Sequence, residues 1–295
     1  MDPLVTVFGG SGFLGRHVVA ALASAPWRVR VAVRHADAVP GFDAEVVSAD
    51  VRDGESTAAA LAGASAVVNA VGLWDERDGA SFEAVHVRGA ERVARFAAQA
   101  GIAHLVHVSG IGADEASPSR YVRARAAGEA RVRARFPQAT IVRPGVMFGP
   151  GDALLTTLDR LTARSPVVPL FGHGETRLAP VFVDDVARVI VAALDAAAAR
   201  GQTFELGGPE VMSYATLVRR VLAFRRRRRI LAPVPFDAWA AAARLAARLP
   251  HAPLTPDQVT LMREDKLPDP ARDGFAALGL VPRRLEGLLG LSLSS

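Results

Sequence analysis

Short apolar runs alternate with helical stretches through the first half of the chain. Six runs have the composition of strands and cover residues 4–8, 29–33, 44–47, 66–71, 105–108 and 140–142. Apolar residues recur with helical spacing over 14–25, 81–100 and 119–136. Strands that alternate with helices in this way are typical of a parallel sheet covered by helices.

A glycine-rich turn joins the first run to the first helical stretch. It consists of Gly9, Gly10, Ser11, Gly12, Phe13, Leu14 and Gly15. Such glycines let the backbone approach a diphosphate closely, and the helix N-terminus then offers free N–H groups to that anion. A tight turn without a ligand would use the same glycines. Because the turn directly follows the first strand of an alternating series, we predict a dinucleotide-binding, Rossmann-type doubly wound parallel sheet in an α/β protein.

The second half of the chain has a looser pattern. Proline, glycine and histidine separate short helical pieces after Gly149, and a further strand–helix unit is expected at 181–183 and 184–199, with a strand at 203–206. We therefore expect two domains. The NAD(P)-binding Rossmann domain would comprise 1–149 and 177–206, and a small, mostly helical C-terminal domain for substrate or docking would comprise 150–176 and 207–295.

Composition excludes several classes of function. The chain has no cysteine, so disulfides, thiolate nucleophiles and cysteine-ligated metals are excluded. No cluster with metal-ligand spacing is found, so no metal is expected. The longest uncharged stretch, 56–74, contains Ser, Thr and Asn and does not suit a membrane span. A net charge of +5 and the lack of a nucleic-acid-binding motif argue against nucleic-acid binding.

The end of the second strand indicates the type of nucleotide. An acid there would bind the ribose hydroxyls of NAD, whereas an arginine accommodates the 2′-phosphate of NADP. Here Arg34 follows the strand and the first acid comes only at Asp37. NADP(H) is therefore preferred and NAD(H) stays possible, since Arg34 could also be a solvated strand end. Asp50, before Val51, is placed to reach an adenine amino group, or it is an ordinary turn aspartate.

A serine, a tyrosine and an arginine form a second candidate set. Ser109 follows the fifth strand, and Tyr121 and Arg125 share one face of the next helix because they are four residues apart. A tyrosine acid/base needs a neighbouring cation to lower its pKa, and a serine hydroxyl could hold a substrate carbonyl. Taken alone, these residues would also fit an aromatic side chain that packs on the sheet beside a surface arginine.

The chain resembles the short-chain dehydrogenase/reductase superfamily in its atypical, extended form. The residues that carry the resemblance are GGSGFLG at 9–15, Asp50-Val51, NAVG at 69–72, VHVSGIGAD at 106–114 and the Tyr121 helix. The resemblance implies cofactor contacts beyond the glycine turn. They would come from Arg34, Asp50, Val51, Ala70, Val71, Gly72, Ser109, Tyr121, Arg125 and Pro144, although Pro144 could equally be a simple strand end.

Within that superfamily the chain is similar to the nucleotide-binding accessory subunit of respiratory complex I and its bacterial homologues. The likeness extends through PVFVDDVARVI at 180–190, FELGGPEVMSY at 204–214 and LTPDQVTLMREDKLPD at 254–269. It implies a tightly held NADPH and a peripheral association with a membrane enzyme, NADH:ubiquinone oxidoreductase. Since no signal peptide is visible, we expect a cytoplasmic protein that could lie on the cytoplasmic face of the inner membrane.

One departure from the superfamily pattern leaves catalysis open. The Tyr-x-x-x-Lys pair is Tyr121 and Arg125 here, and arginine supplies charge but hardly releases a proton. This favours a structural or redox-sensing cofactor in an accessory subunit. The alternatives are an active reductase or epimerase-dehydratase that uses Tyr121 as acid/base, and a soluble redox-sensing regulator.

An arginine run lies in the predicted smaller domain. Arg225, Arg226, Arg227, Arg228 and Arg229 follow an apolar helix and precede a helix that contains Trp239. Basic residues beside amphipathic helices suit an anionic membrane surface or a partner subunit. A solvated helix end would show the same run.

Overall fold

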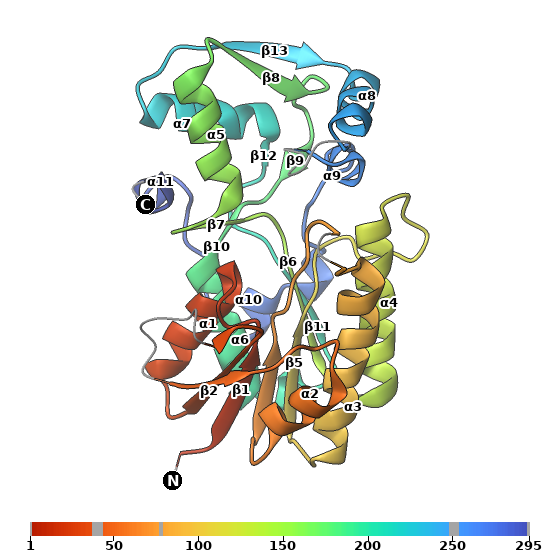
Figure 1. Ribbon diagram of the computed structural model, residues 1–295. Coiled ribbons are helices and arrows are strands. Elements are labelled where there is room, and N and C mark those ends of the chain that lie inside the picture. Colours follow the sequence, from red (N-terminus) through yellow and green to blue (C-terminus); the bar gives the residue numbers. More distant parts are fainter. Residues whose placement is uncertain (1, 37–43, 77–78, 248–253, 294–295) are drawn as a thin grey trace. The chain divides into compact units, whose positions relative to one another are not determined.

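Seven parallel strands form the main sheet of the protein (Figure 1). The computed structural model describes residues 2–36, 44–76, 79–247 and 254–293. Across the sheet the strands are β3 (Glu45–Ser48), β2 (Arg28–Val33), β1 (Leu4–Phe8), β4 (Ala66–Asn69), β5 (His104–Val108), β6 (Thr140–Pro144) and β11 (Thr203–Leu206). The order reverses its direction between β1 and β4. This arrangement confirms the predicted doubly wound sheet of the Rossmann type.

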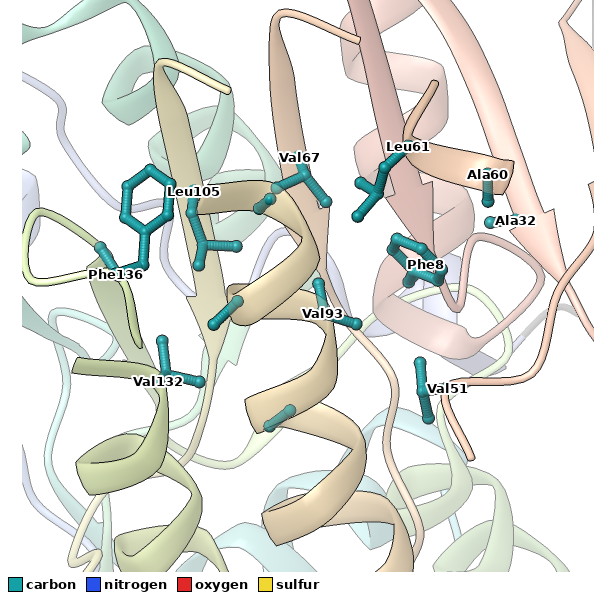
Figure 2. Packing of buried hydrophobic residues seen from close by; sticks show 14 of the residues in the cluster. Phe8, Ala32, Val51, Ala60, Leu61, Val67, Val93, Leu105, Val132 and Phe136 are labelled. Atoms are coloured by element: carbon teal, nitrogen blue, oxygen red, sulfur yellow. The ribbon is translucent and has the colours of Figure 1, made fainter. Parts of the chain in front are cut away.

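Helices cover the main sheet and explain why its central strands are apolar. All residues of β1 and β4 are buried, as expected for strands with helices on both faces. Helices α2 (Gly54–Leu61), α3 (Ala90–Gln99) and α4 (Arg120–Arg135) pack on one face. Phe8, Leu61, Val93 and Val132 belong to the apolar cluster on this face (Figure 2). On the other face α1 (Phe13–Ala23) packs against α6 (Val183–Asp195).

The helical stretch expected at 81–100 consists of two kinds of helix. A π-helix, η2, covers Glu83–Gly89, and α3 follows it at Ala90–Gln99. The buried residues of α3 are Ala90, Val93, Ala94 and Ala97, which is the apolar face that the spacing predicts. The π-helical turn was not predicted, because π-helices are rare and occur as single turns inside α-helical stretches.

The chain divides into two units. The larger unit comprises Met1–Pro144, Val183–Leu206 and Asp269–Val281, and the smaller one comprises Gly145–Phe182, Gly207–Pro268 and Pro282–Ser295. The expected boundaries at 149/150 and 176/177 lie at 144/145 and 182/183 in the structure. Segment 269–281, expected in the C-terminal domain, is part of the larger unit. It contains η4 (Pro270–Arg272) and α10 (Gly274–Ala277), which contact β11.

The smaller unit contains helices and three two-stranded sheets. Its helices are α5 (Ala153–Arg164), α7 (Tyr214–Phe224), α8 (Phe236–Ala246), α9 (Pro256–Leu261) and α11 (Leu289–Leu293). The strand pairs are β7 (Met147–Phe148) with β10 (Val181–Phe182), β9 (Arg177–Leu178) with β12 (Met212–Ser213), and β8 (Val167–Phe171) with β13 (Ile230–Val234). The strand expected at 181–183 is therefore outside the main sheet. A short 3-10 helix, η3 (Ala197–Ala199), follows α6 in the larger unit.

The described helices can be compared with the requirements for a membrane-spanning segment. In the four described ranges of the chain, no helix combines the length and the apolar character needed to cross a bilayer.

Candidate functional site

The turn between β1 and α1 is built around two glycines. Gly9 has a φ of +75°, and its carbonyl oxygen accepts a hydrogen bond from the Gly12 amide at 2.9 Å. A Cβ on Gly15 would lie 2.0 Å from that same oxygen. Gly15 therefore lets the helix approach the turn, and Gly9 supplies a backbone conformation that other residues rarely adopt.

Helix α1 begins without a side-chain cap. Its N-cap residue is Gly12, whereas Asp53, Ser119, Asp152 and Ser213 cap helices α2, α4, α5 and α7 with a side-chain oxygen. A helix N-terminus carries unsatisfied N–H groups and a positive dipole end. The α1 amides therefore fit an anion such as the diphosphate of a dinucleotide.

A cavity of about 190 Å³ opens beside this turn, at the carboxyl ends of β1, β2 and β4. Nine of the predicted cofactor residues line it: Gly9, Ser11, Gly12, Arg34, Asp50, Val51, Ala70, Val71 and Gly72. The structure thus brings together residues from four separate loops. In open α/β sheets, ligands bind at the carboxyl ends of the strands where the strand order reverses, so the cavity occupies the expected place.

Among the described residues of the cavity lining, the other members of the glycine turn do not appear. A Cβ on Gly10 would meet the Val31 side chain at 2.6 Å. Leu14 is buried, and the Phe13 ring contacts the edge of the His17 ring and the Arg16 guanidinium. These residues support the turn, as Gly15 does. Asp37 lies outside the described residues.

An ion pair in the cavity wall holds Asp50. The Arg52 Nε and Nη2 atoms donate to both Asp50 carboxylate oxygens, with the shortest bond at 2.6 Å. The Arg52 guanidinium holds the pKa of the Asp50 carboxyl below its usual value, and Arg34 contributes to the same effect. Two arginines, Arg34 and Arg52, therefore line this end of the cavity. Sequence reasoning identified Arg34 and missed Arg52, although Arg52 lies two residues after Asp50.

Tyr121 and Arg125 are in contact, as their spacing on one helix predicts. The Arg125 Nε donates to the Tyr121 hydroxyl at 3.1 Å, and Arg125 Nη1 donates to the Val108 carbonyl at 2.7 Å. Both side chains are buried. In the part of the chain that the structure describes, no carboxylate is an ion-pair partner of Arg125. A Cβ on Gly72 would lie 3.7 Å from Arg125 Nη2, so the guanidinium lies close to Gly72, one of the residues that line the cavity.

Aromatic rings enclose Tyr121. The Trp74 indole stacks on its ring at 4.7 Å between centroids, and Phe82 and His86 contact the ring edge-on. Trp74 itself is 59% exposed. His86 lies in the π-helix, and its Nε2 atom is 2.9 Å from the Leu73 carbonyl oxygen. Sequence reasoning missed Trp74 and His86, because their relation to Tyr121 is purely tertiary.

Two histidines near Arg125 are buried and neutral. Burial lowers the pKa of His86 to about 3 and that of His107 to about 3, and the positive charge of Arg125 adds to both effects. His107 Nδ1 lies 3.2 Å from the Asn69 side-chain nitrogen. In the described ranges no group of three potential metal ligands occurs.

Ser109 carries a buried polar atom that lacks a partner. Within the described residues its Oγ makes no hydrogen bond, although the side chain is only 3% exposed. Its backbone amide donates to the Val142 carbonyl at 2.7 Å, and the Pro144 carbonyl accepts from Ile111 at 3.2 Å. A buried hydroxyl without a partner is costly in free energy. A ligand atom at this position would remove that cost, so the residues present fit a bound dinucleotide or substrate.

Comparison with known proteins places this geometry in a family. The model of the NAD dependent epimerase/dehydratase family matches residues 5–207. The chain is 36% identical over 303 residues to NADH dehydrogenase [ubiquinone] 1 alpha subcomplex subunit 9, mitochondrial, of Arabidopsis thaliana, a match that covers 96% of this chain and 75% of that protein. It is 40% identical over 192 residues to the ceramide reductase of Caulobacter vibrioides, over 64% of this chain and 60% of that enzyme.

Solved structures agree on the fold. An NADPH-dependent quinone oxidoreductase from Escherichia coli, complexed with NADPH, superposes with a TM-score of 0.77 at 18% identity over 97% of this chain and 98% of that chain. A UDP-glucose 4-epimerase from Thermus thermophilus, complexed with NAD, gives 0.76 at 18% identity over 99% and 98%. The family model and the Arabidopsis relative confirm the predicted family: the chain belongs to the NAD dependent epimerase/dehydratase family, within the extended short-chain dehydrogenases and reductases.

Proposed function

We propose that this protein binds a nicotinamide dinucleotide, with NADPH preferred, as an accessory partner of a quinone-reducing NADH dehydrogenase. The observation that carries the proposal is the uncapped α1 N-terminus that faces a cavity lined by Gly9, Gly12, Arg34 and Arg52. The α1 amides would hold the diphosphate. The two arginines would donate hydrogen bonds to the 2′-phosphate, because guanidinium groups bind phosphate oxygens in pairs.

The charge of Arg125 favours the reduced form of the cofactor. When bound, the nicotinamide group gives or takes a hydride, and its oxidised form carries one positive charge more than its reduced form. Arg125 is buried, permanently charged and without a carboxylate among the described residues. Like charges repel strongly where water is excluded. We therefore propose that Arg125 makes the site select NADPH over NADP⁺, which suits a structural or redox-sensing role.

The partner is proposed from the relatives. The Arabidopsis relative is named as a subunit of NADH dehydrogenase [ubiquinone], and the likeness to it extends over 96% of this chain. A corresponding partner here would be an NADH:ubiquinone oxidoreductase, with this protein peripheral on the cytoplasmic side of the membrane.

Mass spectrometry of the protein as isolated tests cofactor and partner together. The expected result is one bound NADPH and co-purifying NADH dehydrogenase subunits. Calorimetry should then give a dissociation constant at least tenfold lower for NADPH than for NADP⁺, and Arg125→Gln should narrow that ratio. A chain that binds neither nucleotide would refute the whole proposal, whereas equal affinities would refute only the selection of the reduced form.

A paired substitution tests NADPH against NADH. Arg34→Gln together with Arg52→Gln should weaken NADPH binding and leave NADH binding nearly unchanged. Arg88→Gln, an exposed arginine of the larger unit, is the matched control and should affect neither. If the double variant weakens both nucleotides equally, the 2′-phosphate is not what these arginines bind.

A second candidate function is a carbonyl reductase, and Ser109 favours it. The partnerless Ser109 hydroxyl could hold a substrate carbonyl oxygen, and Tyr121, hydrogen-bonded to Arg125, could donate the proton. The ceramide reductase relative shares 40% identity over 192 residues. NADPH oxidation in the presence of long-chain ketones tests it. Turnover that Tyr121→Phe abolishes without loss of NADPH binding would support the enzyme, and a wild-type protein without turnover would reject it.

A further inference from the structure

The arginine run 225–229 is divided by the structure into an inward and an outward set. Arg225 and Arg227 both bind the Asp159 carboxylate of α5, at 2.7 Å and 2.6 Å. Arg229 Nε donates to the Thr162 carbonyl at 2.8 Å. These three arginines attach the segment between α7 and β13 to α5, so they are structural cations of the smaller unit and not a free basic patch.

The outward set consists of the two arginines that alternate with Arg225, Arg227 and Arg229 in the sequence. Arg226 and Arg228 are exposed, and Arg226 has a φ of +52°. Two apolar residues flank this pair on the same segment: Phe224 is 43% exposed and Ile230 is 67% exposed. We call Phe224, Arg226, Arg228 and Ile230 the 224–230 face.

The 224–230 face continues onto the neighbouring strand. Ile230 pairs in register with Val167, which is 38% exposed, and its amide donates to the Pro166 carbonyl at 3.0 Å. Arg164, exposed, lies at the end of α5 two residues before Pro166. Figure 1 shows α5, α7, β8 and β13 together in the smaller unit. These neighbouring segments therefore expose both cations and large apolar side chains.

No acid interrupts this surface along the chain. Residues 160–174 and 211–236 contain neither aspartate nor glutamate. The acids that border these two ranges are Asp159, Glu175, Glu210 and Asp237. Asp159 has both carboxylate oxygens bound by Arg225 and Arg227, and Glu210 and Asp237 pair with Arg220 and Arg263. The charge of Arg164, Arg226 and Arg228 is therefore uncompensated by these segments and is available to an anionic partner.

We propose that the 224–230 face, with Val167 and Arg164, docks onto the surface of an anionic lipid bilayer. Cations next to exposed apolar side chains match the interfacial layer of a membrane, where the cations contact phosphates and the apolar groups reach the acyl boundary. A nucleic acid would use the cations and leave Ile230 and Phe224 in water. The proposal does not depend on nucleotide binding.

Flotation of the full-length protein with vesicles tests this docking. Wild-type protein should bind vesicles of phosphatidylcholine with 30% phosphatidylglycerol, a composition chosen for the assay, and should lose binding in high salt or on pure phosphatidylcholine. Arg226→Asn with Arg228→Gln should lower the partition coefficient about thirtyfold, from about 1 kcal/mol for each basic residue near the lipid. Asparagine suits position 226 because it tolerates a positive φ.

Control variants show whether a loss of flotation comes from the 224–230 face, from misfolding or from a lower net charge. Arg88→Gln with Arg131→Gln removes two exposed charges from the larger unit and should leave flotation unchanged. Ile230→Ser alone should also reduce flotation, which a purely electrostatic contact would not show. All variants must keep the wild-type denaturation midpoint. Flotation that is insensitive to Arg226 and Arg228, or lost equally in the control, overturns the proposal. So does a wild type that ignores anionic vesicles and binds only an acidic protein.

Discussion

At the scale of single residues, two glycines of the turn between β1 and α1 are needed for different reasons. Gly15 has no room for a methyl group, because the Gly9 carbonyl would lie 2.0 Å away. Gly12 is less crowded, since a Cβ there would meet only that carbonyl oxygen, at 3.1 Å. Two glycines of one motif therefore serve different purposes, one for folding and one for the approach of a ligand.

Gly15→Ala is expected to damage both stability and binding. The methyl group must push α1 away from the turn, at a cost of about 1–3 kcal/mol for an overpacked site. Chemical denaturation and nucleotide calorimetry measure the two effects. Gly287→Ala, with open space around the added Cβ, is the control and should change neither. An unchanged Gly15→Ala variant would show that the turn can relax freely.

The buried histidines make stability depend on pH. His86 and His107 have a pKa of about 3 in the folded protein, against 6.5 for a free histidine, so the unfolded chain binds more protons between these values. The contribution of these histidines to the free energy of unfolding is therefore complete above pH 6.5, and it is lost progressively as the pH falls toward 3. Each histidine contributes a slope of about 1.4 kcal/mol per pH unit.

His107→Gln should remove one of these two slopes. Denaturation midpoints at a series of pH values from 7.5 to 4.5 measure the change, and the slope is the readout because the substitution also alters the absolute stability. The exposed His173→Gln is the control and should keep the wild-type slope. If the His107→Gln protein keeps the full wild-type slope of stability against pH, His107 is not a source of the acid sensitivity.

At the scale of elements, a buried ion triad joins three parts of the larger unit. Arg143 of β6 donates to Glu129 of α4 at 2.9 Å and 2.7 Å and to Glu205 of β11 at 3.0 Å. The other Glu205 oxygen accepts from the Asp269 amide at 2.9 Å. Glu129 and Glu205 are both buried, so each depends on the arginine for its charge balance.

Arg143→Met should destabilise the protein by about 3–5 kcal/mol, because it leaves two buried carboxylates without a cation. Adding Glu129→Leu and Glu205→Leu should recover much of that loss, since an apolar cluster can replace a buried ion group. Urea denaturation of the single and triple variants measures both steps. A triple variant that is less stable than the single one would mean that the carboxylates have another essential contact.

Local patterns predicted most of the sheet, and they could not predict what depends on distant contacts. The six strands of the first half and the glycine turn have signals in adjacent residues. The π-helix around His86 has none, because its register is set by packing: a Cβ on Gly128 of α4 would lie 2.0 Å from the His86 carbonyl oxygen. The contacts of Arg225, Arg227 and Arg229 with Asp159 and Thr162 could not be predicted for the same reason, because these partners lie more than sixty residues away in the chain. The ion pair of Arg52 with Asp50 is local and could have been predicted from the sequence.

At the scale of the whole molecule, the larger unit is completed by a segment that follows most of the smaller one in the chain. Phe275 of α10 is 3% exposed, and a Cβ on Gly274 would meet Phe204 and Leu206 of β11. The sequence alone assigned this segment to the C-terminal domain, because contiguity along the chain was the only guide.

Phe275→Ala should destabilise the larger unit by about 3–5 kcal/mol, the usual cost of deleting a buried phenylalanine side chain. Hydrogen exchange of β6 and β11 amides locates the loss in that unit. Val281→Ala, at a position 77% exposed, is the control. Loss of protection confined to the smaller unit would contradict the assignment of residues 269–281.

The return of segment 269–281 to β11 also constrains how the protein is made. During synthesis on the ribosome, β1 to β6 and β11 emerge long before Phe275. The edge strand β11 therefore lacks its contacts with α10 while the intervening residues are translated. Domains generally fold as units during synthesis. For this chain, the larger unit cannot be completed during translation until residue 281 has left the exit tunnel, whereas most of the smaller unit has emerged by then.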